Sequence, residues 1–334
     1  MAENCVKATN PSLYCVDTKD SFSTGEEVLL NEPKLEKEGD KKDHSDAAST
    51  YDIVKATQYG IFDRVQHLLD VENVKVNTRD AENVTLLHWA AINNRLELSR
   101  LFLSREAEVD AIGGELKSTP LHWAVRQGHF QMVLLLMQNG ADPNIKDGEG
   151  CSGLHLAAQF GHTSIVAYLV AKSCHINDTD GNGMTPLMWS AFRATQGLDP
   201  TRLLLTLGAS TSMRDNLHGN TPLHWALLSK NLHAVSLLVT KFNADVLAVN
   251  LQGLSCVDLF KNHVKKAREA RQNKSACGNP GEFMFFPRKV AEKFEIHLPK
   301  DFLGEGLKQA KGRRWFCPDF LTKFFADPKV SSIF

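Results

Sequence analysis

A His-Trp pair stands out in this sequence, because such a pair can belong to a catalytic or a metal-binding site. The stretch STPLHWAVRQGH, residues 118–129, places His122 beside Trp123. A catalytic histidine needs a nucleophile or a second base within hydrogen-bonding reach, and a zinc ion needs several ligands about 2 Å away. The first question is therefore whether the fold brings other reactive side chains to this pair.

The same phrase recurs along the chain at intervals of 33 to 36 residues. Its copies begin at Thr85, Thr119, Ser152, Thr185, Thr221 and Ser255. A degenerate earlier copy starts at Asp52. A period of this length predicts a solenoid, in which every unit packs on its neighbours and the terminal units are atypical.

Each unit carries the signals of two short helices. Thr119 can cap a helix N-terminus while Pro120 occupies the first helical position. Gly128 ends that helix, and the apolar spacing of HFQMVLLLMQN predicts a second one. Polar loops that contain glycine, such as KDGEGC, lead to the next unit. We therefore expect an all-α solenoid of about seven helix-turn-helix units with hairpin-like loops.

Composition divides the chain into three parts. Residues 1–50 are acidic and poor in apolar side chains, which predicts a disordered head. Residues 51–265 form the repeat domain, and residues 266–334 form a basic, aromatic tail of uncertain structure. Three alternatives stay open for the tail: a cap on the last repeat, a loose segment in solution, or a peripheral contact with an anionic membrane surface.

The histidines at the repeated position are predicted to be structural. They are His88, His122, His155 and His224. Stacked helices lie about 8–10 Å apart, so histidines that occur once per unit cannot converge on one ion. We expect them to bond the backbone or the capping hydroxyl near each helix start. We expect no catalytic residue, no metal site and no cofactor.

The tryptophans offer a different kind of chemistry. Four of them share one register of the repeat: Trp89, Trp123, Trp189 and Trp225. They either pack only between repeats or line a groove that accepts a partner, since Trp is favoured in binding hot spots. Trp89 and Asn93 are four residues apart and share a helix face, and Asn93 can donate to and accept from an extended backbone. We predict a partner-binding site at Asn93, Trp123 and Trp89.

The period and the Thr-Pro-Leu-His-x-Ala phrase resemble the ankyrin repeat. More specifically, NVTLLHWAAINNRLEL, STPLHWAVRQGH and LHLAAQFGHTSIVAYLVAK look like the N-terminal array of the ankyrin-repeat protein S-palmitoyltransferases of the huntingtin-interacting type. The resemblance covers about residues 52–260. It implies that the array recruits substrate proteins through extended, Gln-Pro-containing segments of disordered regions. The matching groove positions are Asn93 and Trp123.

The same resemblance implies a membrane-embedded zinc domain with an Asp-His-His-Cys motif. The sequence contains no such tetrad and no apolar run of roughly 20 residues. We therefore expect no acyltransferase activity and no transmembrane segment in the chain as written. The alternative is that it is an incomplete record of a membrane-embedded S-palmitoyltransferase.

Charge and cysteine usage suggest where such a chain works. The net charge is −1, and the seven cysteines contain no C-x-x-C, which favours a reducing compartment. We expect a cytoplasmic monomer, with the cytosolic face of Golgi or vesicle membranes as a further location. No nucleic-acid partner is expected, because no recognition motif accompanies the basic tail.

Overall fold

The structure is a computed structural model that describes residues 50–193, 200–272 and 293–294, all within the compact unit 46–334. Its helices are α2 (Ile53–Tyr59), α3 (Phe62–Asp70), α4 (Leu86–Ile92), α5 (Leu96–Ser104), α6 (Pro120–Gln127), α7 (Phe130–Gln138), α8 (Gly153–Phe160), α9 (Thr163–Ala171), α10 (Pro186–Phe192), α11 (Pro200–Thr206), α12 (Pro222–Leu228), α13 (Leu232–Thr240) and α14 (Cys256–Gln272). The predicted head and almost all of the predicted tail lie outside the described residues. The predicted domain boundaries stay predictions.

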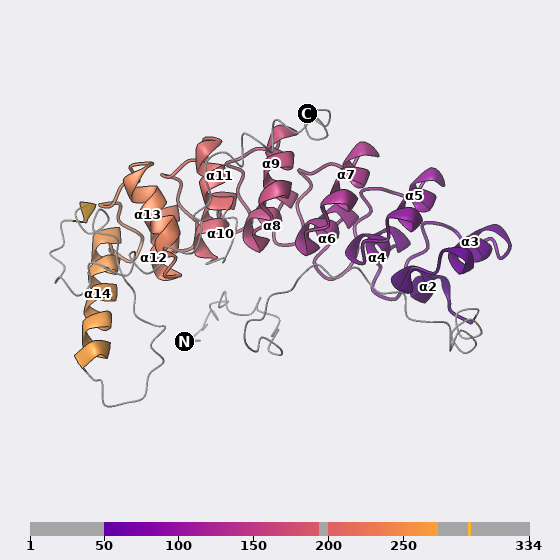
Figure 1. Cartoon of the computed structure of the whole chain (residues 1–334), viewed down its shortest axis with the longest axis horizontal. Helices are drawn as coiled ribbons and strands as arrows, with labels where there is room; N and C mark the ends of the chain where they lie inside the picture. Colours follow the sequence, from indigo (N-terminus) through magenta and orange to yellow (C-terminus); the bar gives the residue numbers. More distant parts are fainter. Residues whose placement is uncertain (1–49, 194–199, 273–292, 295–334) are drawn as a thin grey trace, which may run out of the picture. The chain divides into compact units, whose positions relative to one another are not determined.

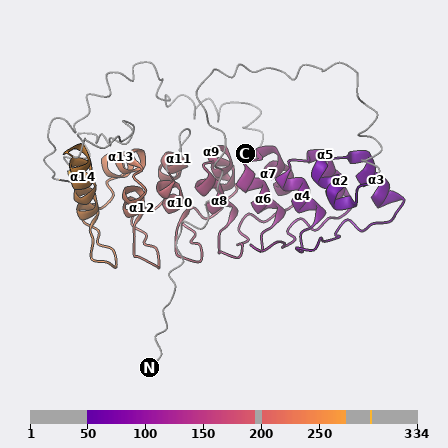
Figure 2. The same ribbon diagram turned by 90° about the horizontal axis from the view of Figure 1, so that it is seen from below.

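The helices form two parallel rows (Figure 1). The first helix of each pair, from α2 to α12, packs on the first helix of the next pair, and α12 packs on α14. The second helices, α3 to α13, pack on one another behind them. Figure 2 shows the connecting loops projecting from the row of first helices, on the side away from the second helices. The predicted all-α solenoid is confirmed. Within the described ranges it has six helix pairs, and α14 stands in place of a seventh.

The helix starts follow from three residue types. Thr85, Thr119, Ser152 and Thr221 are N-caps, and each forms a capping box with the histidine three residues later. Proline fills the first position of α6, α10 and α12, where a backbone donor is not needed. Each first helix therefore begins at a defined residue, and this fixes which side chains it presents to the loops.

Glycine ends several first helices in a left-handed conformation. Gly60, Gly128 and Gly161 have φ of 80°, 76° and 79°. At Gly128 a side chain is excluded for a second reason, because a Cβ there would lie 2.5 Å from the imidazole of His162. The sharp reversal and the close approach of the next repeat both require glycine.

The core runs continuously between the two rows. Buried Leu, Val, Ile and Ala side chains of the described units form one cluster that extends to Phe260 of α14. The ring of Phe260 stacks on Phe294, with the centroids 4.5 Å apart and the planes 6° apart. Phe294 is 2% exposed. This tail residue therefore covers apolar surface of the last helix.

Short loops connect the pairs and touch one another. Isolated β-bridges close three of them, at Arg79–Thr85, Gly113–Ser118 and Val249–Ser255. Backbone hydrogen bonds join successive loops, from Gly148 N to Leu116 O, Gly181 N to Glu149 O, Asn216 N to Asn182 O and Leu251 N to His218 O. These bonds fix the spacing of the loops along the array.

Candidate partner-binding site

Each repeat-position histidine uses both ring nitrogens. Nδ1 of His88 lies 2.8 Å from Oγ1 of Thr85, and Nε2 lies 2.9 Å from the carbonyl oxygen of Ser118. His122, His155 and His224 bond in the same way to their own capping hydroxyl and to Cys151 O, Met184 O and Leu254 O. Each ring thus joins the start of its own helix to the following loop.

Burial keeps these histidines neutral. It lowers the pKa of His88 to about 4, although the bond to Ser118 acts in the opposite direction. Burial also lowers the pKa values of His122, His155 and His224. In the described ranges, no group of three or more His, Cys, Asp or Glu side chains is arranged to hold a metal ion.

One Cys-His contact deserves comparison with a nucleophile-base pair. Sγ of Cys256 lies 3.3 Å from Nδ1 of His224. Cys256 is fully buried, and burial raises the pKa of its thiol to about 12. A protonated thiol without access to solvent cannot attack a substrate at neutral pH.

Three of the four register tryptophans are tied to loop carboxylates. Their indole N–H groups donate to Oδ2 of an aspartate in the preceding loop. The pairs are Trp89–Asp80 at 2.8 Å, Trp189–Asp180 at 2.9 Å and Trp225–Asp215 at 3.1 Å. These indole nitrogens are therefore engaged within the protein.

Trp123 is the exception, because glycine occupies its loop position. The backbone bond from Gly113 N to Ser118 O corresponds to the one from Asp80 N to Val84 O, so Gly113 takes the place of the aspartate. A Cβ on Gly113 would lie 2.7 Å from the backbone oxygen of Asn83. No described residue accepts a hydrogen bond from Nε1 of Trp123, and this nitrogen is not buried.

In the next repeat the aspartate is present and the tryptophan is missing. Asp147 is present, but Leu156 occupies the tryptophan position. Oδ1 of Asp147 accepts from the backbone of Glu149 and Cys151 at 3.0 and 2.9 Å. Oδ2 is buried and has no hydrogen-bond donor among the described residues.

The three predicted site residues form one contiguous group. The ring of Trp123 meets Trp89 edge to face, with centroids 5.6 Å apart and planes at 89°, and contacts His88 at 5.2 Å. Asn93 is the C-cap of α4, one residue beyond the helix, and its Nδ2 donates to Trp89 O at 2.9 Å. Asn93 is exposed, and its Oδ1 accepts from no described residue. An open donor on Trp123 and an open acceptor on Asn93 thus belong to residues that both contact Trp89.

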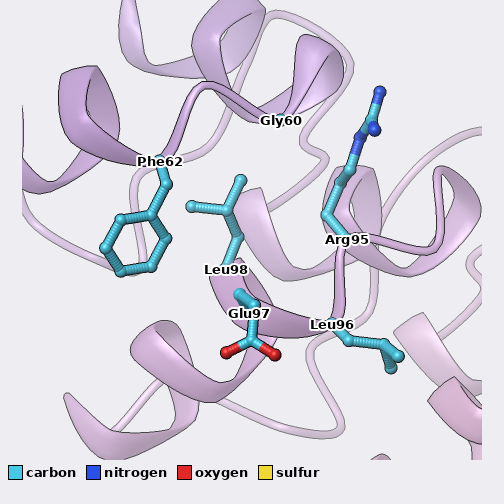
Figure 3. A pocket seen from close by; sticks show the side chains of 6 residues that line it. All are labelled: Gly60, Phe62, Arg95, Leu96, Glu97 and Leu98. Carbon is cyan, nitrogen blue, oxygen red and sulfur yellow. The ribbon is translucent and has the colours of Figure 1, made fainter. Parts of the chain in front are cut away.

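A cavity of about 450 Å³ lies beside the first two repeats but has a different character. Its lining comprises Gly60, Phe62, Arg95, Leu96, Glu97 and Leu98 (Figure 3). The Arg95 guanidinium bonds to Gln58 O, and Glu97 pairs with Arg100. The polar groups of this cavity are already engaged, and none of the predicted site residues lines it.

Comparison with known families explains the repeating geometry. The family model described as ankyrin repeats (3 copies) matches residues 53–147, 132–215 and 154–250. This chain belongs to the ankyrin-repeat family. The ankyrin resemblance predicted from the sequence is confirmed.

The ankyrin region is also similar to named palmitoyltransferases. Palmitoyltransferase ZDHHC17 of Danio rerio is 59% identical over 239 residues, and the protein of that name from Homo sapiens is 58% identical over 239 residues. Each match covers 69% of this chain, and 38% and 37% of the respective relative. Palmitoyltransferase Hip14 of Drosophila melanogaster is 60% identical over 214 residues, covering 64% of this chain and 33% of the fly protein.

The matches thus cover only 33% to 38% of the length of these relatives. In the portion of this chain that the structure describes, no helix has the length and hydropathy of a membrane span.

Proposed function

We propose that this ankyrin array binds short, extended, Gln-Pro-containing segments of partner proteins and is the substrate-recruiting part of a protein palmitoylation system. The open indole N–H of Trp123 carries the proposal. The other three tryptophans of the register donate this N–H to an aspartate. At Trp123 this donor stays available to a ligand group, because it is accessible to solvent and no described residue accepts from it.

The chemistry of a Gln-Pro segment suits these side chains. Proline presents an apolar ring without a backbone N–H, so it can pack on the indole face of Trp123 without leaving a buried donor. The glutamine side chain or a neighbouring carbonyl can accept from Nε1. Asn93 offers Oδ1 to a backbone N–H of an extended segment, whose own donors and acceptors are unpaired.

A second candidate is that the chain is one part of a longer protein-cysteine S-palmitoyltransferase. The relatives named palmitoyltransferases are much longer than the matched region, which supports this alternative. Sequencing the full transcript tests it: an in-frame extension with several spanning helices and Asp-His-His-Cys would favour the enzyme. In either case we propose that the array acts in the cytoplasm, at the cytosolic face of Golgi or vesicle membranes, as a monomer.

The binding proposal is tested with a labelled Gln-Pro peptide. Trp123→Ala should weaken binding by about 2 kcal/mol or more, because it removes both the ring and the donor. Trp123→Phe keeps a ring without the N–H and should cause an intermediate loss. Titration calorimetry or fluorescence polarisation measures both affinities, and circular dichroism checks that each variant is folded.

Asn93→Ala has a closely matched control. Asn139 is also an exposed C-cap, at the end of α7, and its Nδ2 donates to Leu135 O at 2.8 Å. Both alanine variants lose the same local bond, but only Asn93 lies beside Trp89. Peptide binding should weaken in Asn93→Ala and not in Asn139→Ala. Unchanged affinity in both Trp123→Ala and Asn93→Ala would contradict the proposed site.

A further inference from the structure

Two arginines and a phenylalanine form a cationic cluster next to the proposed site. The guanidinium carbon of Arg126 lies 5.6 Å from the centroid of the Phe160 ring, and that of Arg193 lies 5.2 Å from the same centroid. The three residues come from consecutive first helices: the last turn of α6, the end of α8 and the C-cap of α10. We call this group the Arg-Phe-Arg cluster.

The cluster carries positive charge without internal neutralisation. Neither arginine forms an ion pair with a described carboxylate, and Arg126 has no hydrogen-bond acceptor among the described residues. Arg193 donates to the backbone oxygen of Gln159 at 2.9 Å. Arg126 and Phe160 are half-buried, and Arg193 is exposed. Both cations are held over the ring while their charges stay available to a ligand.

A neutral histidine completes the aromatic side of the cluster. The imidazole of His162 stacks on Phe160, with centroids 6.4 Å apart and planes 16° apart. Its pKa is lowered mainly by burial, and the charges of Arg193 and His129 lower it further. An anion arriving here therefore meets two guanidinium groups beside a neutral imidazole.

The cluster lies along the same row of helices as the proposed peptide site. Arg126 is three residues after Trp123 in α6, so the two side chains share a face of that helix. Phe160 belongs to the next repeat and Arg193 to the one after. Successive helices lie about 8–10 Å apart, and an extended chain advances about 3.3 Å per residue. A bound segment therefore covers about three residues per repeat.

We propose that the Arg-Phe-Arg cluster binds acidic side chains of the same partner segment, about three to six residues from the position that contacts Trp123. Guanidinium groups donate to carboxylates in pairs, and the ring between them orients both. This inference rests on the proposed function, since it adds a charge requirement to the segment bound at Asn93 and Trp123.

The experiment compares three peptide types against the full chain. The first has a Gln-Pro core with neutral flanks; the second has Asp or Glu three to six positions from the core, on either side in separate peptides; the third has Lys there. An acidic flank on one side should tighten binding about fivefold at low salt, and Lys should weaken it. The gain should shrink in about 0.5 M salt, because salt screens exposed charges.

Arginine variants then test whether the Arg-Phe-Arg cluster causes the gain in affinity from acidic flanks. In Arg126→Gln and in Arg193→Gln the acidic and neutral peptides should bind with more similar affinities, whereas Arg202→Gln should keep the difference. Arg202 is an exposed arginine of α11, in the second row of helices. Circular dichroism checks that each variant is folded. Because Arg193 is exposed, its replacement should disturb the fold less than that of the half-buried Arg126.

The outcomes separate this inference from the proposed function. If the neutral peptide binds and acidic flanks on both sides add nothing, the cluster inference is wrong and the proposed function stands. A gain that survives in both arginine variants would also overturn it. If only acidic peptides bind, through the arginines, the Trp123 site is wrong and the cluster stands. If no peptide binds, both are wrong.

Discussion

Asp180 and Asp147 occupy the same loop position in neighbouring repeats but have different partners. Both carboxylates use Oδ1 to accept two backbone N–H groups of their own loop. Oδ2 of Asp180 accepts from Trp189, whereas Oδ2 of Asp147 is buried without a donor among the described residues. The two residues therefore separate the loop-closing role of the aspartate from its bond to tryptophan.

Asparagine substitutions should show this difference. Asp180→Asn keeps the loop bonds but places an amide N–H against the indole N–H, which should lower the free energy of unfolding by about 2 kcal/mol. Asp147→Asn loses no such bond and should change it by less than about 0.5 kcal/mol. Urea denaturation measures both. Asn250 already closes its loop as an asparagine, accepting from Gln252 and Leu254. Equal losses in the two variants would show that the indole bond contributes nothing.

At the scale of a single element, the first helix of each pair is short and depends on how it ends. Gly128 ends α6 at φ 76°, and its Cα lies against His162, whose Nε2 is 3.2 Å from Arg126 O. Gly140, after α7, has φ 90° and open space where a Cβ would be. The two glycines share the backbone requirement, but only Gly128 is also restricted by a neighbour.

Alanine substitutions separate these two requirements. Gly140→Ala should cost about 1 kcal/mol of stability, from backbone strain alone. Gly128→Ala should cost at least about 1 kcal/mol more, because the methyl group must displace the His162 ring. Thermal and urea denaturation measure the two losses. If the losses were equal, the contact between Gly128 and His162 would be too adaptable to matter.

On the scale of the whole molecule, neutral histidines occur in four of the repeats, on α4, α6, α8 and α12. They should make the stability of the array depend on pH. The folded state lowers the pKa of His88 from an ordinary 6.5 to about 4. Between these values the unfolded chain binds more protons than the folded one, so stability rises with pH and is fully present above about pH 6.5.

We therefore expect the free energy of unfolding to fall as pH decreases from 6.5 toward 4, by up to about 1.4 kcal/mol per pH unit from His88, with His122, His155 and His224 acting in the same direction. Urea denaturation at a series of pH values measures the slope. His88→Asn should be less stable at pH 7, because the capping box is lost, but should show a smaller slope. An unchanged slope in this variant would mean that His88 is not the group that titrates.

The sequence predicted the solenoid well because its signals are local. Thr119, Pro120 and His122 act within one helical turn, and Gly128 ends the same helix nine residues after Thr119. Repetition of the same signals identified the units without any knowledge of their contacts.

The exceptional state of Trp123 could not be predicted in this way. Asp80 precedes Trp89 by nine residues, but the loop from Gly113 to Ser118 is one residue longer, so the equivalent position is ten residues before Trp123. The register becomes visible only from the backbone bonds. Similarly, Arg126 and Arg193 meet over Phe160 only because three repeats stack.

The backbone bonds between successive loops have a consequence for the thermodynamics of binding. They join each loop to the next across four junctions, from Leu116 to Leu251. The edge of the array is thus already arranged when a partner arrives, and the conformational entropy lost on binding comes chiefly from the partner segment. Affinity is then governed by how much freedom that segment has before it binds, as well as by its sequence.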